Sequence, residues 1–501
     1  MLYLQIASPK SSVLNFLDSN SFEVIISIFQ RTEKVPDMER LLLFFLPLTI
    51  FLYYLADDNY KNLILLLASV LFYAYGEPHF VFVMLFSIIV NYFIALLIDK
   101  TNTIIYRKLL LSVAIIINVG MLWLYKYSNF TIRIINHLIH RNMFNQLKIS
   151  LPIGISFFTF QILSYVIDVY RKKVNPQRNI INLALYISFF PQLIAGPIVR
   201  YIDMEKQLEI NNRRFNQSDF FLGFKRFMIG FCKKILIANN LSEIVQKVFA
   251  CNYSEANILY LWLGAVCFTF QIYYDFSGYS DMAIGLGKMF GFDIPENFNY
   301  PYMAESATDF WRRWHMSLSQ WFRDYVYIPL GGNRRNILRT IFNLFVVWTL
   351  TGIWHGAGAQ FLFWGISWFT VLIIEKYIIN IEEKGKFLKF VWHIITGFVI
   401  VIEWVVFNSE SLGNAIVFIK SMFGLYGNGL VIDNMILVIM EEYWFFIICA
   451  IIFSIPFKNM INKINKKLIS IVETIIVAWC FVWSVSYLVL GVNNPFLYFN
   501  F

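Results

Sequence analysis

The stretch "LTGIWHGAGAQ", Leu350 to Gln360, places a single histidine, His355, between a tryptophan and a glycine in a largely apolar run from Ile341 to Phe369. An ionisable side chain inside such a run is costly if the run lies in lipid, and it then marks a candidate functional site. The first question is therefore whether the chain is a membrane protein.

The composition answers that question. The chain has 501 residues, of which 58% are hydrophobic and 15% are charged, whereas roughly 25% of the residues in soluble domains are charged. A helix that crosses the hydrocarbon core needs about 20 apolar residues. Apolar runs near that length are Leu41–Ala56, Leu63–Tyr75, Phe80–Ile98, Leu109–Tyr127, Leu151–Tyr170, Ile181–Val199, Ile258–Tyr274, Ile341–Gly356, Phe361–Ile379, Phe387–Phe407, Met435–Ile455 and Leu468–Val492. Some are short or broken, so we predict an all-α polytopic integral membrane protein with about 10–12 spans plus re-entrant and interfacial helices.

The basic loops predict the orientation of the chain, because lysine and arginine concentrate on the cytoplasmic side. The basic loops are Asp99–Lys108, Arg171–Arg178, Glu382–Lys389 and Lys458–Lys467, which puts Asn408–Asn414 and Asn493–Phe501 outside. These loops account for much of the net charge of +9, so the charge indicates no nucleic-acid partner. The segment Tyr201–Glu255 stays ambiguous, because Phe224–Asn240 fits either a basic amphipathic surface helix or a buried span.

The chain divides into two parts by this pattern. Residues 1–38 match none of the apolar runs and are predicted to form a peripheral extension, whereas residues 39–501 are predicted to form a single membrane domain.

The five cysteines are scattered without a CxxC or CxxH pair, which argues against a zinc site and against a disulfide framework. From this cysteine pattern we expect no metal site.

Two stretches interrupt the apolar runs with breaks and polar residues. In Pro191–Tyr201, two prolines and a glycine break the apolar run. The break is interpreted equally well as a kink that serves packing or as the wall of a cavity. In Phe270–Tyr302, Asp275 and Asp281 flank a Ser-Gly-Tyr-Ser sequence. We interpret this second stretch as a re-entrant or interfacial segment in which the aspartates are structural acceptors rather than catalysts.

The stretch Asp309–Arg335 has the pattern of an amphipathic helix at the membrane interface. At helical spacing, one face carries Phe310, Trp311, Trp314, Leu318, Trp321, Phe322 and Tyr325. Arginines occupy much of the opposite face, which is typical of a helix at headgroup depth. On this interpretation alone, His315 is an ordinary polar residue that reaches toward the headgroups.

Six stretches together resemble the membrane-bound O-acyltransferase (MBOAT) family. They are "FFPQLIAGPIVRY", "QIYYDFSGYSDMAIGLGKMFGF", "ENFNYPY", "DFWRRWHMSLSQWFRDYVYIPLGGNRRN", "LTGIWHGAGAQFLFWG" and "NPFLYFNF". Within the family, the likeness is strongest to the membrane subunit of alginate O-acetyltransferase and to related bacterial proteins of polysaccharide and peptidoglycan acetylation. The resemblance covers nearly the whole chain from about Leu41 onward. It implies an MBOAT-type helical core and a multi-pass location in the bacterial cytoplasmic membrane.

The resemblance also implies the reaction and its residues. An O-acyltransferase of this kind takes an acyl group from a cytoplasmic thioester and passes it to an external acceptor. The histidine of the family's WHG stretch is the catalytic candidate and maps onto His355, and the histidine of its RRWH stretch, also implicated in activity, maps onto His315. The chemistry agrees, because a neutral histidine acts as a general base toward an attacking hydroxyl and burial disfavours the charged imidazolium.

The position of each histidine along its helix suggests a separation in depth. If the run that ends near His355 leaves the cytoplasm, its length at 1.5 Å per residue carries that ring roughly 20 Å across the bilayer. We therefore expect His315 at the donor entrance and His355 nearer the external side. Gly352, Gly356 and Gly358 are expected to leave room for an acyl chain or a pantetheine arm, with helix packing as the alternative.

Acetyl-CoA is the expected donor substrate, and no tightly bound cofactor is expected. Arg312, Arg313 and Arg323 suit the phosphates of coenzyme A, although the positive-inside bias alone also puts arginines there. Trp314 and Trp354 complete the candidate donor-binding residues. The expected partners besides membrane lipid are an extracytoplasmic polysaccharide acceptor and a separate external acetyltransferase protein that makes the final transfer.

Three other functions stay open at this point. The first is transfer of D-alanine from a carrier-protein thioester to teichoic acid, with the acidic carrier docked on the same basic patch. The second is a transporter or flippase, which would need a path lined by paired charges. The third is an inactive scaffold for an external transferase.

Overall fold

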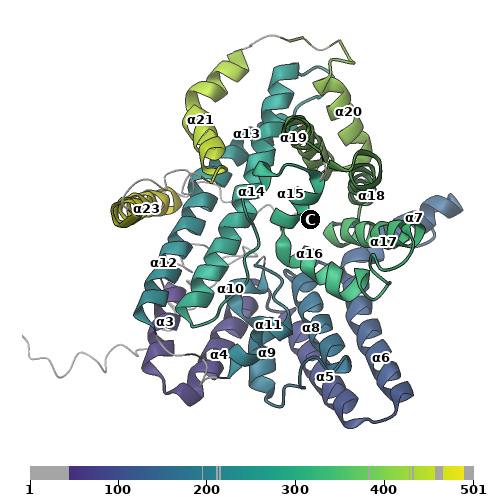
Figure 1. The fold of residues 1–501 in the computed structure, drawn as a ribbon, viewed down its shortest axis with the longest axis vertical. Helices are drawn as coiled ribbons and strands as arrows, with labels where there is room; N and C mark the ends of the chain where they lie inside the picture. The colour runs from purple at the N-terminus through teal and green to yellow at the C-terminus, as the bar shows by residue number, and fades with distance from the viewer. Residues whose placement is uncertain are drawn as a thin grey trace, which may run out of the picture.

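The computed structural model describes residues 44–489, except 195, 210–212, 214–215, 382–383, 428, 431–433 and 457–465. The predicted N-terminal extension, residues 1–38, lies outside the described residues. Every regular element of the described part is helical, which confirms the predicted all-α class. Figure 1 labels these elements in chain order.

The first half of the described chain forms α3 to α13. These elements are α3 (Leu46–Leu55), α4 (Asp58–Gly76), α5 (Val81–Lys100), α6 (Ile104–Leu122), η3 (Trp123–Tyr127), α7 (Ser128–Ile139), α8 (Ile155–Tyr170), α9 (Ile180–Ser188), α10 (Phe190–Leu193), α11 (Tyr201–Met204), η4 (Glu205–Leu208), α12 (Gln217–Cys232), η6 (Lys233–Ala238) and α13 (Asn239–Phe249).

The second half forms α14 to α23. These elements are α14 (Ile258–Met289), η7 (Pro301–Met303), α15 (Ala307–Arg313), α16 (Met316–Phe322), η8 (Arg323–Tyr327), α17 (Ile337–His355), α18 (Ala359–Ile373), η9 (Ile374–Ile379), α19 (Lys386–Asn408), α20 (Leu412–Met422), α21 (Asn434–Phe453) and α23 (Lys466–Val489).

Eight of the described helices are long and apolar enough to cross a membrane. They are α5, the continuous run from α6 through η3 to α7, α14, α17, the run from α18 through η9, α19, α21 and α23. The other predicted runs form α3, α4, α8, and the broken pair α9 and α10, which are shorter or more polar. The described part therefore holds fewer full-length spans than the 10–12 expected, because the runs of α8, α9 and α10 fold as short helices packed inside the protein, and α3 and α4 are too short or too polar to count.

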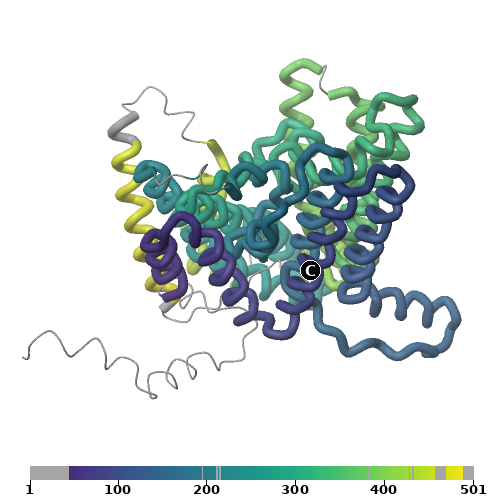
Figure 2. Tube along the Cα trace, turned by 90° about the horizontal axis from the view of Figure 1, so that it is seen from below, coloured from purple at the N-terminus to yellow at the C-terminus, as the bar shows by residue number. Residues whose placement is uncertain are grey.

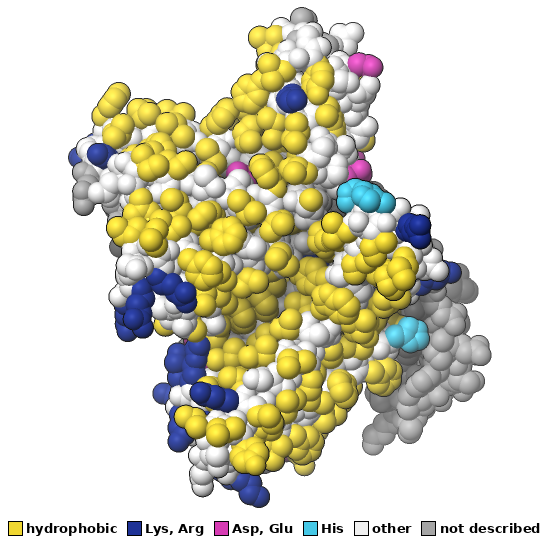
Figure 3. Space-filling model, turned by 90° about the vertical axis from the view of Figure 1, so that its right-hand side faces the viewer, with side chains coloured by type: hydrophobic (Ala, Val, Ile, Leu, Met, Phe, Trp, Pro, Cys, Tyr) yellow, Lys and Arg dark blue, Asp and Glu magenta, His cyan; other side chains and the backbone are white. Residues whose placement is uncertain are grey.

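The surface of the molecule agrees with a membrane location. Figure 3 shows one face that is mostly hydrophobic, with Lys and Arg side chains gathered along one edge. Figure 2 shows α7 and the segment after it, in blue, projecting from the body of the protein. A broad apolar face with a basic rim is the arrangement expected for a protein whose positive side faces the cytoplasm.

Helices α12 and α14 lie side by side at the centre of the molecule (Figure 1), and glycines let the two backbones approach closely. A Cβ added at Gly278 would lie 2.8 Å from the carbonyl oxygen of Gly230, and one added at Gly223 would lie 2.6 Å from that of Gly285. Small residues at a helix interface let two backbones approach in this way. The Phe224–Asn240 segment is consequently a buried helix in contact with α14, not a surface helix.

The predicted break in Phe270–Tyr302 was wrong, because α14 is one continuous helix through the Ser-Gly-Tyr-Ser sequence. The glycine of that sequence, Gly278, allows the close contact with α12 and does not end the helix. The interpretation of the aspartates as structural acceptors is confirmed. Asp275 pairs with Lys234 at 2.6 Å, and Asp281 pairs with Lys233 at 2.7 Å, so both carboxylates bind α14 to η6.

Four described segments, η3, η6, η8 and η9, are π-helical turns. A π turn holds one more residue than an α turn and is often found at functional positions. Each turn carries a polar side chain in contact with a distant element: Lys126 with the carbonyl oxygens of Trp354 and His355, Lys234 with Asp275, Tyr325 with Asp168, and Glu375 with the backbone N–H groups of Ala307 and Thr308. Each π turn therefore positions an ionisable side chain for a contact with another helix or loop.

Candidate active site

His355 is the last residue of α17, where the backbone leaves the helix and becomes extended at Gly356. The side chain is 7% exposed. Its ring lies 4.9 Å from the ring of Trp354, 5.1 Å from Trp364 and 5.2 Å from Phe407, measured between centroids. Elements α17, α18 and α19 thus place this histidine in an aromatic enclosure.

Lys126 holds the end of α17 in place. Its Nζ donates to the carbonyl oxygen of Trp354 at 2.7 Å and to that of His355 at 3.1 Å, and the hydroxyl of Tyr127 donates to the carbonyl oxygen of Ile353 at 2.9 Å. The last carbonyl groups of a helix lack partners within the helix and carry partial negative charge, so an ammonium group is a favourable cap. The π turn η3 therefore supports the backbone of His355.

We predict that Lys126→Met lowers the rate of acyl transfer about 10–100-fold, because hydrogen bonds from a charged group contribute about 1.5–3 kcal/mol and their loss frees the end of α17. The expected loss is in kcat more than in the KM for the donor. Purified variants assayed in proteoliposomes provide the measurement. Lys108→Met, which alters an exposed lysine of α6, is the matched control, and an unchanged kcat for Lys126→Met would show that the cap has no role.

His315 lies at a break between α15 and α16, not within one amphipathic helix. Its φ of 46° is left-handed, a conformation rarely adopted by residues other than glycine. The side chain is only 1% exposed, so the interpretation as a group reaching toward headgroups was wrong. The ring packs 4.7 Å from the ring of Phe276 and 6.0 Å from that of Trp354, and Nδ1 lies 3.2 Å from Oδ1 of Asn297.

The two histidines share one tryptophan. The ring of Trp354 lies 6.0 Å from His315 and 4.9 Å from His355, between centroids. The expected separation of roughly 20 Å in depth was therefore wrong. It failed because α15 and α16 carry His315 into the protein beside the end of α17, which the position of a residue along one helix does not reveal.

The predicted donor-binding residues divide into two groups. Trp314 and Trp354 are buried, and Trp354 contacts both histidines. The guanidinium groups of Arg313 and Arg323 are instead engaged at the surface by neighbouring carboxylates, with N–O distances of 2.9 Å in each pair, and Arg312 is exposed. The structure thus brings Trp354, but not these arginines, to both histidines, whereas the ring of Trp314 packs against other aromatic rings such as Phe298 and Trp404.

The glycines near His355 serve helix packing. A Cβ at Gly352 would overlap the carbonyl oxygen of Phe361 and lie 3.3 Å from Cα of Gly365, and a Cβ at Gly356 would overlap the ring of Phe361. At Gly358 the added atom would meet the side chain of Gln360. At Gly352 and Gly356, protein atoms occupy the space that was expected to admit an acyl chain or a pantetheine arm, so the packing alternative holds for these two glycines.

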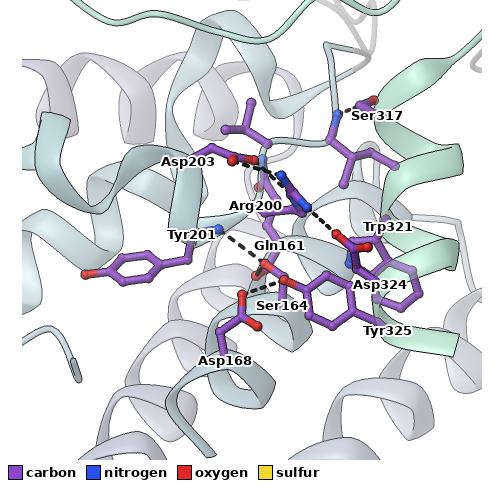
Figure 4. A network of polar contacts seen from close by, with 12 residues as sticks. Gln161, Ser164, Asp168, Arg200, Tyr201, Asp203, Ser317, Trp321, Asp324 and Tyr325 are labelled. Atoms are coloured by element: carbon purple, nitrogen blue, oxygen red, sulfur yellow. Dashed lines mark hydrogen bonds and ion pairs between the residues drawn. The ribbon is translucent and has the colours of Figure 1, made fainter. Parts of the chain in front are cut away.

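A polar network fixes the segment that follows His315 (Figure 4). Arg200 pairs with Asp203 at 2.8 Å and also with Asp324 of η8. In the same network, the hydroxyl of Tyr325 donates to Asp168 of α8 at 2.5 Å. These contacts tie η8 to α8 and to the chain before α11.

The stretch Pro191–Tyr201 packs directly against the element that carries His315. The backbone N–H of Ile198 donates to Oγ of Ser317 at 2.9 Å, and both residues are buried. Of the two interpretations left open, the packing role is the one that the contacts of Ile198 and Arg200 support.

Sequence reasoning missed Lys126, Asn297 and Arg200 as residues near the site. Lys126 had one available signal, since it is a lone charged residue in the apolar run Leu109–Tyr127. Asn297 and Arg200 lie in quoted family stretches, but nothing in their spacing indicates which side chain they contact.

Comparison with known proteins identifies the family of the chain. Residues 67–417 match the MBOAT, membrane-bound O-acyltransferase, family. The probable alginate O-acetylase AlgI of Pseudomonas aeruginosa is 41% identical over 388 residues, which cover 76% of this chain and 73% of the relative. The peptidoglycan O-acetyltransferase of Helicobacter pylori is 35% identical over 507 residues, covering 91% and 95%. The teichoic acid D-alanyltransferase of Bacillus subtilis is 28% identical over 268 residues, covering 51% and 67%. The chain belongs to the membrane-bound O-acyltransferase family.

Proposed function

We propose that this protein transfers an acetyl group from cytoplasmic acetyl-CoA toward a hydroxyl group of an extracytoplasmic polysaccharide, with His315 and His355 as the catalytic residues. The observation that carries the proposal is the meeting of two buried histidines, from separate elements, on the indole of Trp354. Burial keeps an imidazole neutral and able to accept a proton.

The proposed reaction needs a proton acceptor and then a proton donor. As the acceptor hydroxyl attacks the thioester carbonyl, a C–O bond forms and the hydroxyl proton passes to a histidine nitrogen. The C–S bond then breaks, and the leaving thiolate takes that proton to give the free thiol. A histidine suits both steps because it gains and loses a proton near neutral pH.

The relatives favour acetyl over D-alanyl transfer. The peptidoglycan O-acetyltransferase of Helicobacter pylori aligns with 91% of the chain at 35% identity, whereas the teichoic acid D-alanyltransferase of Bacillus subtilis aligns with 51% at 28%. Transfer of D-alanine from a carrier protein therefore remains the second candidate. Both donors are thioesters, so the same histidines would serve either reaction.

The arginines near the start of α17 support entry of the donor from the cytoplasm. A cavity of about 710 Å³ opens beside Arg335 and Arg339, at the start of α17. Arginine is suited to phosphate groups, so this cavity is a better candidate for docking the donor phosphates than the paired Arg313 and Arg323. On the opposite side, we propose that a separate external acetyltransferase receives the acetyl group and modifies the polymer.

We expect proteoliposomes that contain the purified protein to release free coenzyme A from radiolabelled acetyl-CoA when an extracytoplasmic acceptor system is present. The parallel measurement supplies a D-alanyl carrier protein in place of acetyl-CoA. Acetyl transfer without D-alanyl transfer supports the proposal, and the reverse result assigns the second candidate. Transfer from neither donor would favour an inactive scaffold or a flippase and would overturn the proposed function.

A further inference from the structure

Asn297 lies in the chain between α14 and η7, outside both histidine-bearing helices, and its side chain is fully buried. Its Oδ1 accepts from the backbone N–H of Ser317 at 3.2 Å and from the hydroxyl of Ser317 at 2.8 Å. The same oxygen lies 3.2 Å from Nδ1 of His315, and Nδ2 donates to Oγ of Ser280 at 3.2 Å. Asn297 therefore joins α14 and α16 next to His315.

Two backbone N–H groups determine which atom donates and which accepts in the hydrogen bonds of Ser317 with Asn297. The N–H of Ser317 can only donate, so the amide atom that faces it must be the oxygen of Asn297, because the opposite orientation would set one donor against another. The N–H of Ile198 likewise donates to Oγ of Ser317. The hydroxyl hydrogen of Ser317 is thus directed to Oδ1 of Asn297.

Because Oδ1 of Asn297 faces His315, only one of the two neutral tautomers of His315 fits the structure. Its Nδ1 faces an oxygen that only accepts, so Nδ1 must carry the hydrogen, and Nε2 then has a lone pair. Nε2 is buried and has no hydrogen-bond partner among the described residues. Burial also lowers the pKa of His315, which favours the neutral ring over imidazolium before the substrate hydroxyl attacks.

We propose that Asn297 is a positioning residue that holds His315 as the Nδ1–H tautomer, so that Nε2 is always the acceptor presented to the substrate. This inference rests on the proposed function for its catalytic meaning, but the tautomer itself does not depend on activity. The unpartnered Nε2 lies in an aromatic surrounding formed with Phe276 and Trp354. A substrate hydroxyl would supply the missing donor.

A neutral amide also suits the return of the proton. When Nε2 takes the hydroxyl proton, Nδ1–H still donates to Oδ1 of Asn297, so the ring keeps its orientation. Asn297 carries no charge and does not stabilise imidazolium as a carboxylate would. The proton on Nε2 is therefore released readily to the leaving thiolate.

The first experiment observes the tautomer directly. The full-length protein with ¹⁵N-labelled histidine is reconstituted in lipid, and the signals of His315 are identified by their loss in His315→Gln. We expect a protonated Nδ1 and an unprotonated Nε2 at pH 7. The Nε2–H tautomer in the wild-type protein would overturn the inference, whatever the activity. A confirmed Nδ1–H tautomer with full transfer by His315→Gln would instead reject the catalytic role of His315 in the proposed function.

The second experiment uses the pH dependence of kcat in two variants. Asn297→Asp keeps an acceptor oxygen but adds a negative charge, which favours imidazolium, so the acid limb of the profile is expected to move upward by about 1–3 pH units. Asn297→Ala removes the acceptor, and we expect a lower kcat together with a mixture of tautomers in the NMR spectrum.

Asn91→Ala is the matched control, because Asn91 is also a fully buried asparagine with hydrogen bonds between helices, here α5 and α6. It is expected to lower stability without moving the acid limb. An unmoved acid limb in Asn297→Asp, or a pure Nδ1–H tautomer in Asn297→Ala, would contradict the proposal. If either Asn297 variant fails to fold, the NMR spectrum of the wild-type protein still tests whether His315 is the Nδ1–H tautomer.

Discussion

His355→Ala is expected to lower the rate of acyl transfer about 10²–10⁴-fold, the range for loss of a general acid or base, while membrane insertion and yield stay near normal. Alanine would remove ring contacts with Trp364 and Phe407 but would leave no charged group unpaired, because these neighbours are uncharged. The measurement is single-turnover transfer from radiolabelled acetyl-CoA by purified protein in proteoliposomes.

The control for this experiment is His137→Ala, which changes an exposed histidine of α7. Because His355 and His315 contact the same indole, we expect donor binding to fall together in His355→Ala and His315→Ala if they contribute to one donor site. Wild-type transfer by well-expressed His355→Ala would remove this residue from the mechanism.

Gly352→Leu is expected to separate α17 from α18 and to destabilise the folded protein by at least the 1–3 kcal/mol that is typical of overpacking. The added side chain would meet the backbone of Phe361 and Gly365, and backbone atoms cannot move aside as a flexible side chain can. Because His355 ends the displaced helix, transfer should be lost as well.

Thermal unfolding in detergent, measured together with transfer, tests the effect of Gly352→Leu. Gly397→Ala is the matched control, since a Cβ at Gly397 of α19 has nothing within 4 Å. A Gly352→Leu protein with unchanged melting temperature would show that the contact between α17 and α18 tolerates a large side chain.

The fold class was predictable because hydrophobic length is a local property. Runs such as Phe80–Ile98 and Phe387–Phe407 became α5 and α19 with small shifts at their ends. The number of spans was harder to predict, since Leu151–Tyr170 is also largely apolar but folds as the 16-residue helix α8, buried by its neighbours. Burial by protein and burial by lipid leave the same apolar pattern in a sequence.

The candidate site was predictable in its residues but not in its geometry. His315 and His355 were identified from family stretches, and their catalytic roles remain predictions. Their closeness depends on the break between α15 and α16, where Trp314 is extended and His315 has a left-handed φ, because these two residues redirect the chain. No residue type signals that conformation here, because the position is held by tertiary contacts such as Asn297 with Ser317.

The π turns have a consequence for how such a site changes over time. A π turn contains one residue more than an α turn, so deletion of that residue is expected to restore a regular helix. Deletion within η3 would leave α6 and α7 as one α-helix but remove Lys126 from the carbonyl groups of α17. A buried polar contact in this protein can therefore be gained or lost through a single codon insertion or deletion, without any substitution at the partner residue.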